Sequence, residues 1–566
     1  MIQTDKYTCR QLAGALAAFG VKDVVTSPGS RNAPLLMALD RTKELHVHSV
    51  VDERSAAFIA LGIAEISQRP VAIVCTSGSA VLNYGPAVAE AFYKKIPLIV
   101  VSGDRPMEWI DQADSQTIRQ PGALSNIVKA SYTLKAEADT DEERWYIDRI
   151  LNDAIQHAVI SPAGPVHINI SIAEPHTREI DVDASCSFRK IEYNCPTEKL
   201  ETSKARTLAQ RLHCANVLIA GACNPPSNAL SRSLGALASQ PNIVVVAEGI
   251  SNIKTDKAFS TPDVIFGPKC QLPDPDILIT FGGAPVSARM KKWLRTHDIG
   301  EHWHIGPEHN IVDTYMCLSA AFQYPAESFF PRIAGAMEHL QRVAPSVSTF
   351  ANTWQYAARK ELSHLQNNIE RIQTSGKWSA PVAMAWIVKH IPPAWNLQLG
   401  NGMALRYAQL QPLTSVHRID SNRGVTGMDG STSPAVGAPH AYKGAPTLLI
   451  TGDMSFLYDV GALYSNLITP RLKIIVLNNG GGGIFRHIAS TSGLPETARL
   501  LKCDLNVPVE SLARTFGFDY LRVESYEELR PAFMALQNNC SRPVILEVVS
   551  DTDTDAEVFK ELLGYI

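Results

Sequence analysis

Short apolar runs recur along this 566-residue chain, and a longer segment of helical character follows nearly every one. This alternation is typical of parallel β-sheets, because a chain that returns to add a parallel strand usually does so through a helix. In the first part of the chain the runs lie at 21–26, 45–51, 71–76, 98–102 and 166–172. The pattern predicts an α/β domain over residues 1–185, followed by a polar linker that reaches Lys199.

Two further groups of apolar runs follow. Runs at 217–220, 243–247 and 277–281 predict a smaller central α/β domain over residues 200–345, and the polar segment 341–377 is helix-like. A last domain is expected over 375–566, with strands at 397–399, 416–420, 447–451, 473–477 and 544–548. The length fits about three domains of roughly 100–200 residues each. We therefore expect three doubly wound parallel-sheet domains in series, the first and last alike in layout.

The composition excludes several classes of protein. Hydrophobic residues make up 45% and charged residues 19% of the chain, and the net charge of −4 indicates no attraction to nucleic acid or acidic membranes. Ten cysteines include no C-x-x-C pair, so their spacing suggests neither a disulfide framework nor a zinc site. No signal peptide and no run of about 18 apolar residues is seen. A cytoplasmic protein without a membrane span is expected.

The most specific motif follows the run 447–451. Gly452-Asp453-Met454-Ser455 ends that run, and Asn479 opens the glycine turn Gly480–Gly483 after the next run, 26 residues beyond Asp453. Neighbouring parallel strands end side by side, so Asp453 and Asn479 can place a carboxylate and an amide oxygen around one hard cation. The glycines let the backbone approach a diphosphate closely. An ordinary turn and a flexible loop are the alternative for either motif alone.

Together the two turns resemble the thiamine diphosphate motif, in which Gly-Asp and a later Asn bind Mg²⁺ and the diphosphate of the cofactor. The resemblance implies thiamine diphosphate with Mg²⁺ or Mn²⁺, held by Asp453 and Asn479. A nicotinamide site is the competing interpretation, but Gly480–Gly483 does not fit G-x-G-x-x-G at the start of a helix.

Thiamine chemistry needs a carboxylic acid beside the aminopyrimidine ring, because that acid promotes the imino tautomer. Glu53 fits, since the run 45–51 delivers it to the start of an alanine-rich helix, although an acidic residue is also favoured at any helix N-terminus. The turn Thr76-Ser77-Gly78 resembles the small-residue turn near the aminopyrimidine in this superfamily. Met428 matches the aliphatic wedge that bends the cofactor, with a plain core methionine as the alternative.

Five further motifs resemble one family of this superfamily: Ser27–Pro34, Asp52–Ala56, Gly103–Pro106, Gln116–Gly122 and Ser421–Gly424. They are similar to the 2-succinyl-5-enolpyruvyl-6-hydroxy-3-cyclohexene-1-carboxylate synthases of menaquinone biosynthesis, in order along essentially the whole chain. The resemblance implies that 2-oxoglutarate loses carbon dioxide and is joined to isochorismate by conjugate addition. An acetohydroxyacid synthase or a 2-oxo acid decarboxylase is the alternative within the superfamily. A catalytically silent nucleotide-binding α/β protein is the alternative outside it.

Substrates with several carboxylates demand arginines, whose guanidinium groups bind carboxylates through paired hydrogen bonds. The resemblance places these residues at the substrates: Ser30, Arg31, Arg105, Gln116, Arg406, Arg423, Ile484 and Phe485. It places these at the cofactor and metal: Asn401, Gly402, Met403, Met454, Ser455, Gly481, Gly482 and Gly483, with Gly481 as a backbone ligand of the metal.

The chain departs from the family at two places. Ser115 stands where the family often has Asn, and a lysine of the middle domain is replaced near 287–289, with Arg289 or Lys291 as candidate substitutes. Since Glu53 and Asp453 fall in different domains, and the superfamily completes each site across two subunits, the resemblance also implies a homo-oligomer, dimer or tetramer.

Overall fold

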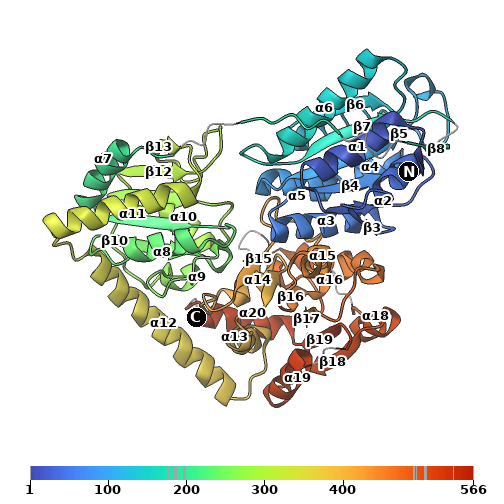
Figure 1. Ribbon diagram of the computed structural model, residues 1–566. Helices are drawn as coiled ribbons and strands as arrows, with labels where there is room; N and C mark the ends of the chain where they lie inside the picture. Colours follow the sequence, from blue (N-terminus) through green and yellow to red (C-terminus); the bar gives the residue numbers. More distant parts are fainter. Residues whose placement is uncertain are drawn as a thin grey trace. The chain divides into compact units, whose positions relative to one another are not determined.

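The computed structural model describes residues 2–174, 177–182, 188–194, 199–487, 491, 494–502, 506–538 and 541–564. These residues form three sheets whose described strand pairs run parallel, with helices packed on them (Figure 1), which confirms the predicted α/β fold class. A small antiparallel sheet pairs β1 (Ile2–Thr4) with β8 (Glu179–Asp181). No helix of the described residues is long and apolar enough to cross a membrane.

The first large sheet has six strands in the order β3-β2-β4-β5-β7-β6. Its central strands are buried along their whole length, as expected when helices cover both faces of a parallel sheet. The strands are β2 (Asp23–Thr26), β3 (His46–Ser49), β4 (Val71–Cys75), β5 (Leu98–Asp104), β6 (Ser131–Lys135) and β7 (Val166–Ser171). The helices are α1 (Tyr7–Ala18), α2 (Ala33–Asp40), α3 (Glu53–Ser67), α4 (Ser79–Asn83), α5 (Gly85–Lys94) and α6 (Asp141–Val159).

The last sheet has the order β15-β14-β16-β17-β19-β18. Counted along the chain within each sheet, this is the same order as in the first, so the expected likeness of the two layouts is confirmed. The strands are β14 (Asn396–Leu399), β15 (Arg418–Asp420), β16 (Thr447–Gly452), β17 (Leu472–Asn478), β18 (Asp519–Val523) and β19 (Val544–Val549). The helices include α13 (Ala380–His390), α14 (Met403–Ala408), α15 (Ser433–Ala441), α16 (Asp453–Tyr458), α18 (Val509–Thr515), α19 (Tyr526–Asn538) and α20 (Thr552–Leu562).

The middle sheet has five strands in the order β10-β9-β11-β12-β13. Its strands are β9 (Val217–Gly221), β10 (Ile243–Ala247), β11 (Ile277–Phe281), β12 (Glu301–Ile305) and β13 (Leu318–Phe322). Its helices are α7 (Thr202–His213), α8 (Asn228–Leu237), α9 (Pro262–Ile265), α10 (Ala288–Thr296) and α11 (Ala326–Val343). The helix-like segment after it forms α12 (Phe350–Thr374), 25 residues long.

The chain folds into two compact units. The first holds residues up to 196 together with 424–447 and 455–472, and the second holds 197–423, 448–454 and 473–566. Part of the last third therefore packs with the first sheet's helices: α15 lies against α3, where Gly62 and Gly437 bring the two backbones together. The predicted domain limits, 1–185, 200–345 and 375–566, stay a prediction.

Candidate active site

The predicted cofactor turns lie where the strand order reverses. In the first sheet the chain leaves β2 for one neighbour and later places β4 on the other side, so the turns after β2 and β4 flank a switch point. A Cβ added to Gly29 would lie 2.3 Å from the Cβ of Thr76, so these turns touch. In the last sheet Gly400 follows β14 and Thr451 lies at the end of β16. A Cβ on Gly400 would lie 2.5 Å from Oγ1 of Thr451, so these two strand ends also touch. Ligands of open α/β sheets bind at such switch points.

Glu53 is the first residue of α3 and is half-buried. Asp52 caps this helix, with its carboxylate accepting from the amide of Arg54 at 3.0 Å and the hydroxyl of Ser55 at 2.8 Å. Burial raises the pKa of the Cys75 thiol, and the charge of Glu53 raises it further. Because Cys75 ends β4, Glu53 lies at the edge that carries the turn Thr76-Ser77-Gly78.

This small-residue turn is fixed by a buried polar network. Gly78 has φ +82° and its amide donates to Oε1 of Gln120 at 3.1 Å. Gln120 in turn donates to Asn169 at 2.7 Å, and Asn169 donates to the carboxylate of Asp104 at 2.8 Å. Predicted Gln116 lies beside the same turn, since its Cγ is 3.2 Å from where a Cβ on Gly78 would stand. A side chain at Gly78 would be strained by φ and crowded by Gln116.

Arg31 and Arg105 lie together at this edge. Arg31 is buried and donates from Nη1 to the carbonyl of Ile172 at 2.8 Å. Arg105 donates from Nε to the carbonyl of Ser115 at 2.9 Å. Its Nη1 forms an ion pair with Oδ2 of Asp114 at 2.7 Å. Burial lowers the pKa of the Arg31 guanidinium, and the nearby charge of Arg105 lowers it further. Both guanidinium groups approach one carboxylate oxygen of Glu174, Arg31 at 3.5 Å and Arg105 at 4.0 Å, so the pair suits a carboxylate ligand. Ser30, next to Arg31, is exposed.

Asp453 and Asn479 come together at the carboxyl ends of β16 and β17. Oδ1 of Asp453 accepts from its neighbour Met454 N at 2.7 Å, and Oδ2 accepts from the amides of Gly481 at 2.8 Å and Asn479 at 3.3 Å. Burial raises the pKa of this carboxyl group, against the lowering effect of the amides. Nδ2 of Asn479 donates to Asp555 at 3.2 Å, which leaves Oδ1 as the oxygen for a cation.

The backbone around these residues leaves room for a diphosphate. Gly480, Gly481 and Gly482 have φ of +80°, +89° and +57°, and Gly402 has φ +99°. A Cβ on Gly402 or Gly480 would meet no atom of the described residues within 4 Å, so both backbones face open space. Glycine is the residue that adopts these angles without strain. The described residues contain no cluster of three or more His, Cys, Asp or Glu that could hold a metal. Mg²⁺ is usually bound through one or two carboxylates together with phosphate oxygens and waters, so such a cluster is not required.

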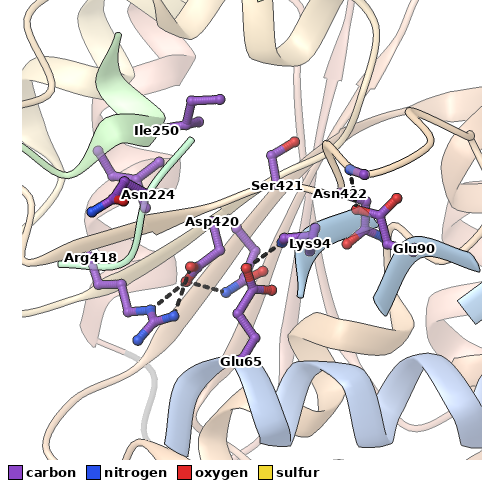
Figure 2. A network of polar contacts seen from close by, with 12 residues as sticks. Glu65, Glu90, Lys94, Asn224, Ile250, Arg418, Asp420, Ser421 and Asn422 are labelled. Atoms are coloured by element: carbon purple, nitrogen blue, oxygen red, sulfur yellow. Dashed lines mark hydrogen bonds and ion pairs between the residues drawn. The ribbon is translucent and has the colours of Figure 1, made fainter. Parts of the chain in front are cut away.

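Arg406 and Arg423 lie beside the turn Asn401-Gly402, which the resemblance assigns to the cofactor. Arg423 is buried and donates from Nη1 to Oδ1 of Asn401 at 3.2 Å and from Nη2 to Pro285 O at 3.1 Å. Arg406 donates from Nη1 to Gly402 O at 2.9 Å. Burial lowers the pKa of Arg406, and the charge of Arg423 lowers it further, so the two guanidinium groups are neighbours. On β15, Arg418 pairs with Asp420 at 2.8 Å (Figure 2).

The structure distinguishes the two candidates left open in the middle domain. Burial lowers the pKa of Lys291, and Arg423 and Arg406 lower it further, so Lys291 lies near the two arginines. Arg289 instead donates to the carbonyls of Asp263 at 2.8 Å and Leu563 at 2.9 Å.

The remaining predicted residues are placed as follows. Met428 is 47% exposed, which excludes a plain core methionine within its compact unit. Ile484 and Phe485 are half-buried in the short helix Gly483–Arg486. Its first residue, Gly483, is one of the residues predicted at the cofactor. Met403 opens α14 and is half-buried, and Ser455 is buried in α16.

Several residues of the site carry no sequence signal. Glu248 is buried and accepts from Val286 N at 2.8 Å and Ser287 N at 2.7 Å, next to the carbonyl that Arg423 uses. Burial raises the pKa of Glu248 to about 7 and that of Asp555 to about 6. Both are single acidic residues outside any motif, and only the folded chain brings them to the site.

Known proteins define the class of this chain. The model of the thiamine pyrophosphate enzyme N-terminal TPP binding domain matches residues 8–123, and that of the C-terminal TPP binding domain matches residues 400–548. These ranges hold the Glu53 edge of the first sheet and the Asp453 edge of the last. The chain is thus a thiamine diphosphate-dependent enzyme with the fold of that class.

Relatives along the full length define the family. The chain is 38% identical over 556 residues to a 2-succinyl-5-enolpyruvyl-6-hydroxy-3-cyclohexene-1-carboxylate synthase of Porphyromonas gingivalis, with 97% of this chain and 95% of the relative covered. Synthases of the same name from Flavobacterium johnsoniae and Bacteroides thetaiotaomicron are 34% and 33% identical, with 96% and 99% of this chain and 96% and 98% of the relatives covered. The chain belongs to the 2-succinyl-5-enolpyruvyl-6-hydroxy-3-cyclohexene-1-carboxylate synthase family.

Proposed function

We infer that this enzyme decarboxylates 2-oxoglutarate and adds the resulting carbanion to isochorismate. The product is 2-succinyl-5-enolpyruvyl-6-hydroxy-3-cyclohexene-1-carboxylate, an intermediate of menaquinone biosynthesis. The observation that carries the inference is the 38% identity to a synthase of that name over 97% of the chain. The two arginine pairs, Arg31 with Arg105 and Arg406 with Arg423, fit substrates that bear several carboxylates.

The protein's residues mainly bind and orient. Thiamine diphosphate, when bound, supplies the nucleophilic carbon and the electron sink for the loss of carbon dioxide. Asp453, Asn479 and the carbonyl of Gly481 would hold Mg²⁺ or Mn²⁺, and the diphosphate would lie against the backbone of Gly402 and Gly480. Glu53 would hold a proton at the ring nitrogen of the aminopyrimidine. The arginines would fix the substrate carboxylates in a water-poor site, where such contacts are strengthened.

A test within the superfamily separates this activity from the alternatives. An acetohydroxyacid synthase or a simple 2-oxo acid decarboxylase would act on pyruvate or release an aldehyde. The holoenzyme is given 2-oxoglutarate or pyruvate, each with isochorismate, and the products are identified by mass spectrometry. Turnover of pyruvate without turnover of 2-oxoglutarate would overturn the proposed function.

The assembly is proposed as a homo-oligomer whose sites are completed by two subunits. Large apolar side chains of the first unit are exposed near the Glu53 end of α3: Val51 at 66%, Tyr458 at 50% and Tyr464 at 49%. Such exposed apolar surface is typical of subunit contacts. Size-exclusion chromatography with light scattering checks this, and a monomer that turns over substrate would contradict it. A cytoplasmic location is proposed from the biosynthetic role.

A further inference from the structure

The segment from Gly424 to Ser433 carries Met428 and is held at both ends by buried carboxylates. We name it the Met428 segment. It belongs to the first compact unit, together with α3, α5 and residues 455–472. The two carboxylates are Glu90, more than 300 residues before the segment, and Asp459, 26 residues after Ser433. Both lie outside every motif of the sequence.

Glu90 holds the beginning of the segment. It lies on α5 and is 1% exposed. Its Oε1 accepts from the amide of Gly424 and its Oε2 from the amide of Val425, both at 2.7 Å (Figure 2). A Cβ on Gly424 would lie 2.6 Å from the carbonyl oxygen of Glu90, so the segment passes directly against the helix. Each carboxylate oxygen of Glu90 thus fixes one of two consecutive amides.

Asp459 holds the end of the segment. It is 0% exposed, and its Oδ2 accepts from the amides of Thr432 at 2.7 Å and Ser433 at 2.6 Å. Its Oδ1 accepts from the hydroxyl of Ser433 at 2.7 Å. Charge-assisted hydrogen bonds of this kind are about twice as strong as those between neutral groups. The segment ends in α15, which packs on α3.

Between the two carboxylates the backbone is tightly defined. Thr426 and Gly430 have φ of +65° and +64°, and a Cβ on Gly430 would lie 2.3 Å from the ring of Phe58 on α3. Met428 nevertheless points outward, 47% exposed. A segment anchored at both ends, with an exposed apolar residue between the anchors, presents that residue instead of burying it.

We propose that Glu90 and Asp459 are positioning residues, which hold the Met428 segment so that Met428 would be presented to the cofactor at a fixed place. The inference rests on the proposed function and on Met428 as the wedge. Burying a carboxylate has a large desolvation cost, and a binding group must be held within about 0.5 Å to act productively. Glu90 and Asp459 each accept hydrogen bonds from two consecutive amides, one pair at each end of the segment.

Hydrogen exchange of the full-length protein, measured without cofactor or substrate, tests the hold itself. In Glu90→Gln we expect exchange at residues 424–425 to quicken about tenfold or more, while 432–433 stay protected. Asp459→Asn should do the reverse, and Ser433→Ala, which removes a single donor, should act more mildly in the same direction. Asp148→Asn is the control, because that half-buried carboxylate accepts from Tyr7 and touches neither end. Unchanged exchange in both Glu90→Gln and Asp459→Asn would overturn the proposal.

Kinetics of the holoenzyme then separate positioning from general stability. We expect Glu90→Gln and Asp459→Asn to lower kcat about tenfold or more, with KM for thiamine diphosphate changed less than about threefold. Full kcat despite faster exchange, or equal losses in kcat and cofactor affinity, would contradict a positioning role. If the wild type makes no product, the proposed function fails and the wedge role with it, while the exchange data still decide whether the carboxylates hold the segment.

Discussion

At Asp453 one carboxylate joins the ends of two strands. Its oxygens accept hydrogen bonds from the amides of Met454, Asn479 and Gly481. The aspartate therefore fixes the shape of the glycine turn, which would also contact the metal ion. The carboxyl pKa is raised mainly by burial. A divalent cation would favour the ionised form, so metal binding and the turn's geometry support each other.

Changing Asp453 to Asn should weaken Mg²⁺-dependent binding of thiamine diphosphate by at least about tenfold, because a charged ligand is lost. Titration calorimetry with both ligands measures this. Asp551→Asn is the matched control: Asp551 caps α20 at the same sheet edge, with Oδ1 accepting from Thr554 N at 2.8 Å, and Asn is as good a cap. Unchanged affinity in Asp453→Asn would exclude Asp453 as a metal ligand.

Changing Glu53 to Gln keeps the size of the side chain but removes its acid. We expect kcat to fall about 100-fold or more, since general acid–base groups contribute on that scale. The unfolding temperature should change little, because Asp52 provides the cap of α3. Turnover close to that of the wild type would refute the assigned role.

His167 makes stability depend on pH. Burial lowers its pKa from 6.5 to about 4. Between pH 4 and pH 6.5 this histidine is therefore protonated in the unfolded chain and neutral in the folded chain. The contribution of neutral, buried His167 to the free energy of unfolding is fully present above pH 6.5 and is lost as the pH falls toward 4. By pH 5 the loss is about 2 kcal/mol.

Urea unfolding at pH 7.5 and pH 5 of the wild type and of His167→Asn isolates this contribution. The wild type should lose more stability on acidification than the variant does, by about the same 2 kcal/mol. Buried carboxyls with raised pKa, such as Glu248 and Asp459, act in the opposite direction and cancel in the difference. An equal loss in both proteins would show that His167 is not buried as described.

Among the elements, helices α3 and α15 pack closely together because each has a glycine at the point of contact. A Cβ on Gly437 would lie 2.2 Å from Ile59 O, and one on Gly62 would lie 2.3 Å from Pro434 O. Because the obstructing atoms are backbone, the helices would have to separate to admit a methyl group.

Gly437→Ala should therefore destabilise the protein by about 1–3 kcal/mol, as overpacking does. Gly335→Ala is its control, since Gly335 lies in α11 and its added Cβ meets nothing within 4 Å. There the substitution should be neutral or stabilising by up to about 1 kcal/mol. Thermal unfolding of both variants checks the pair, and similar midpoints would contradict the close crossing.

Sequence patterning predicted most of the strands of the three parallel sheets, including the edge strands β3, β10 and β15, and missed β6, β12, β13 and β18. β4 and β5 read as continuous apolar runs because both faces are covered. β6 and β13 lie at edges and expose alternate residues, so no apolar run marks them. β12, Glu301–Ile305, was missed for another reason: two histidines and a tryptophan occupy this largely buried strand. Thr280 hydrogen-bonds both histidines, and the indole N–H of Trp303 donates to Glu301.

For the whole molecule, motifs predicted the turns of the site and not their supports. Asp453, Asn479 and the glycines follow strands in a fixed order, so their meeting follows from sheet topology. Glu90, Asp459, Glu248 and Asp555 act through contacts with distant segments, which no local spacing encodes. The two six-stranded sheets share one strand order and present their turns at equivalent switch points.

The roles assigned to the residues of the site depend on the reaction of 2-oxoglutarate with isochorismate. The most direct test is mass-spectrometric analysis of the products that the holoenzyme, with Mg²⁺ and thiamine diphosphate, makes from these two substrates. We predict release of carbon dioxide together with an adduct whose mass equals the sum of the substrates less carbon dioxide. Carbon dioxide released with succinic semialdehyde and no adduct, or no reaction at all, would contradict the proposed reaction.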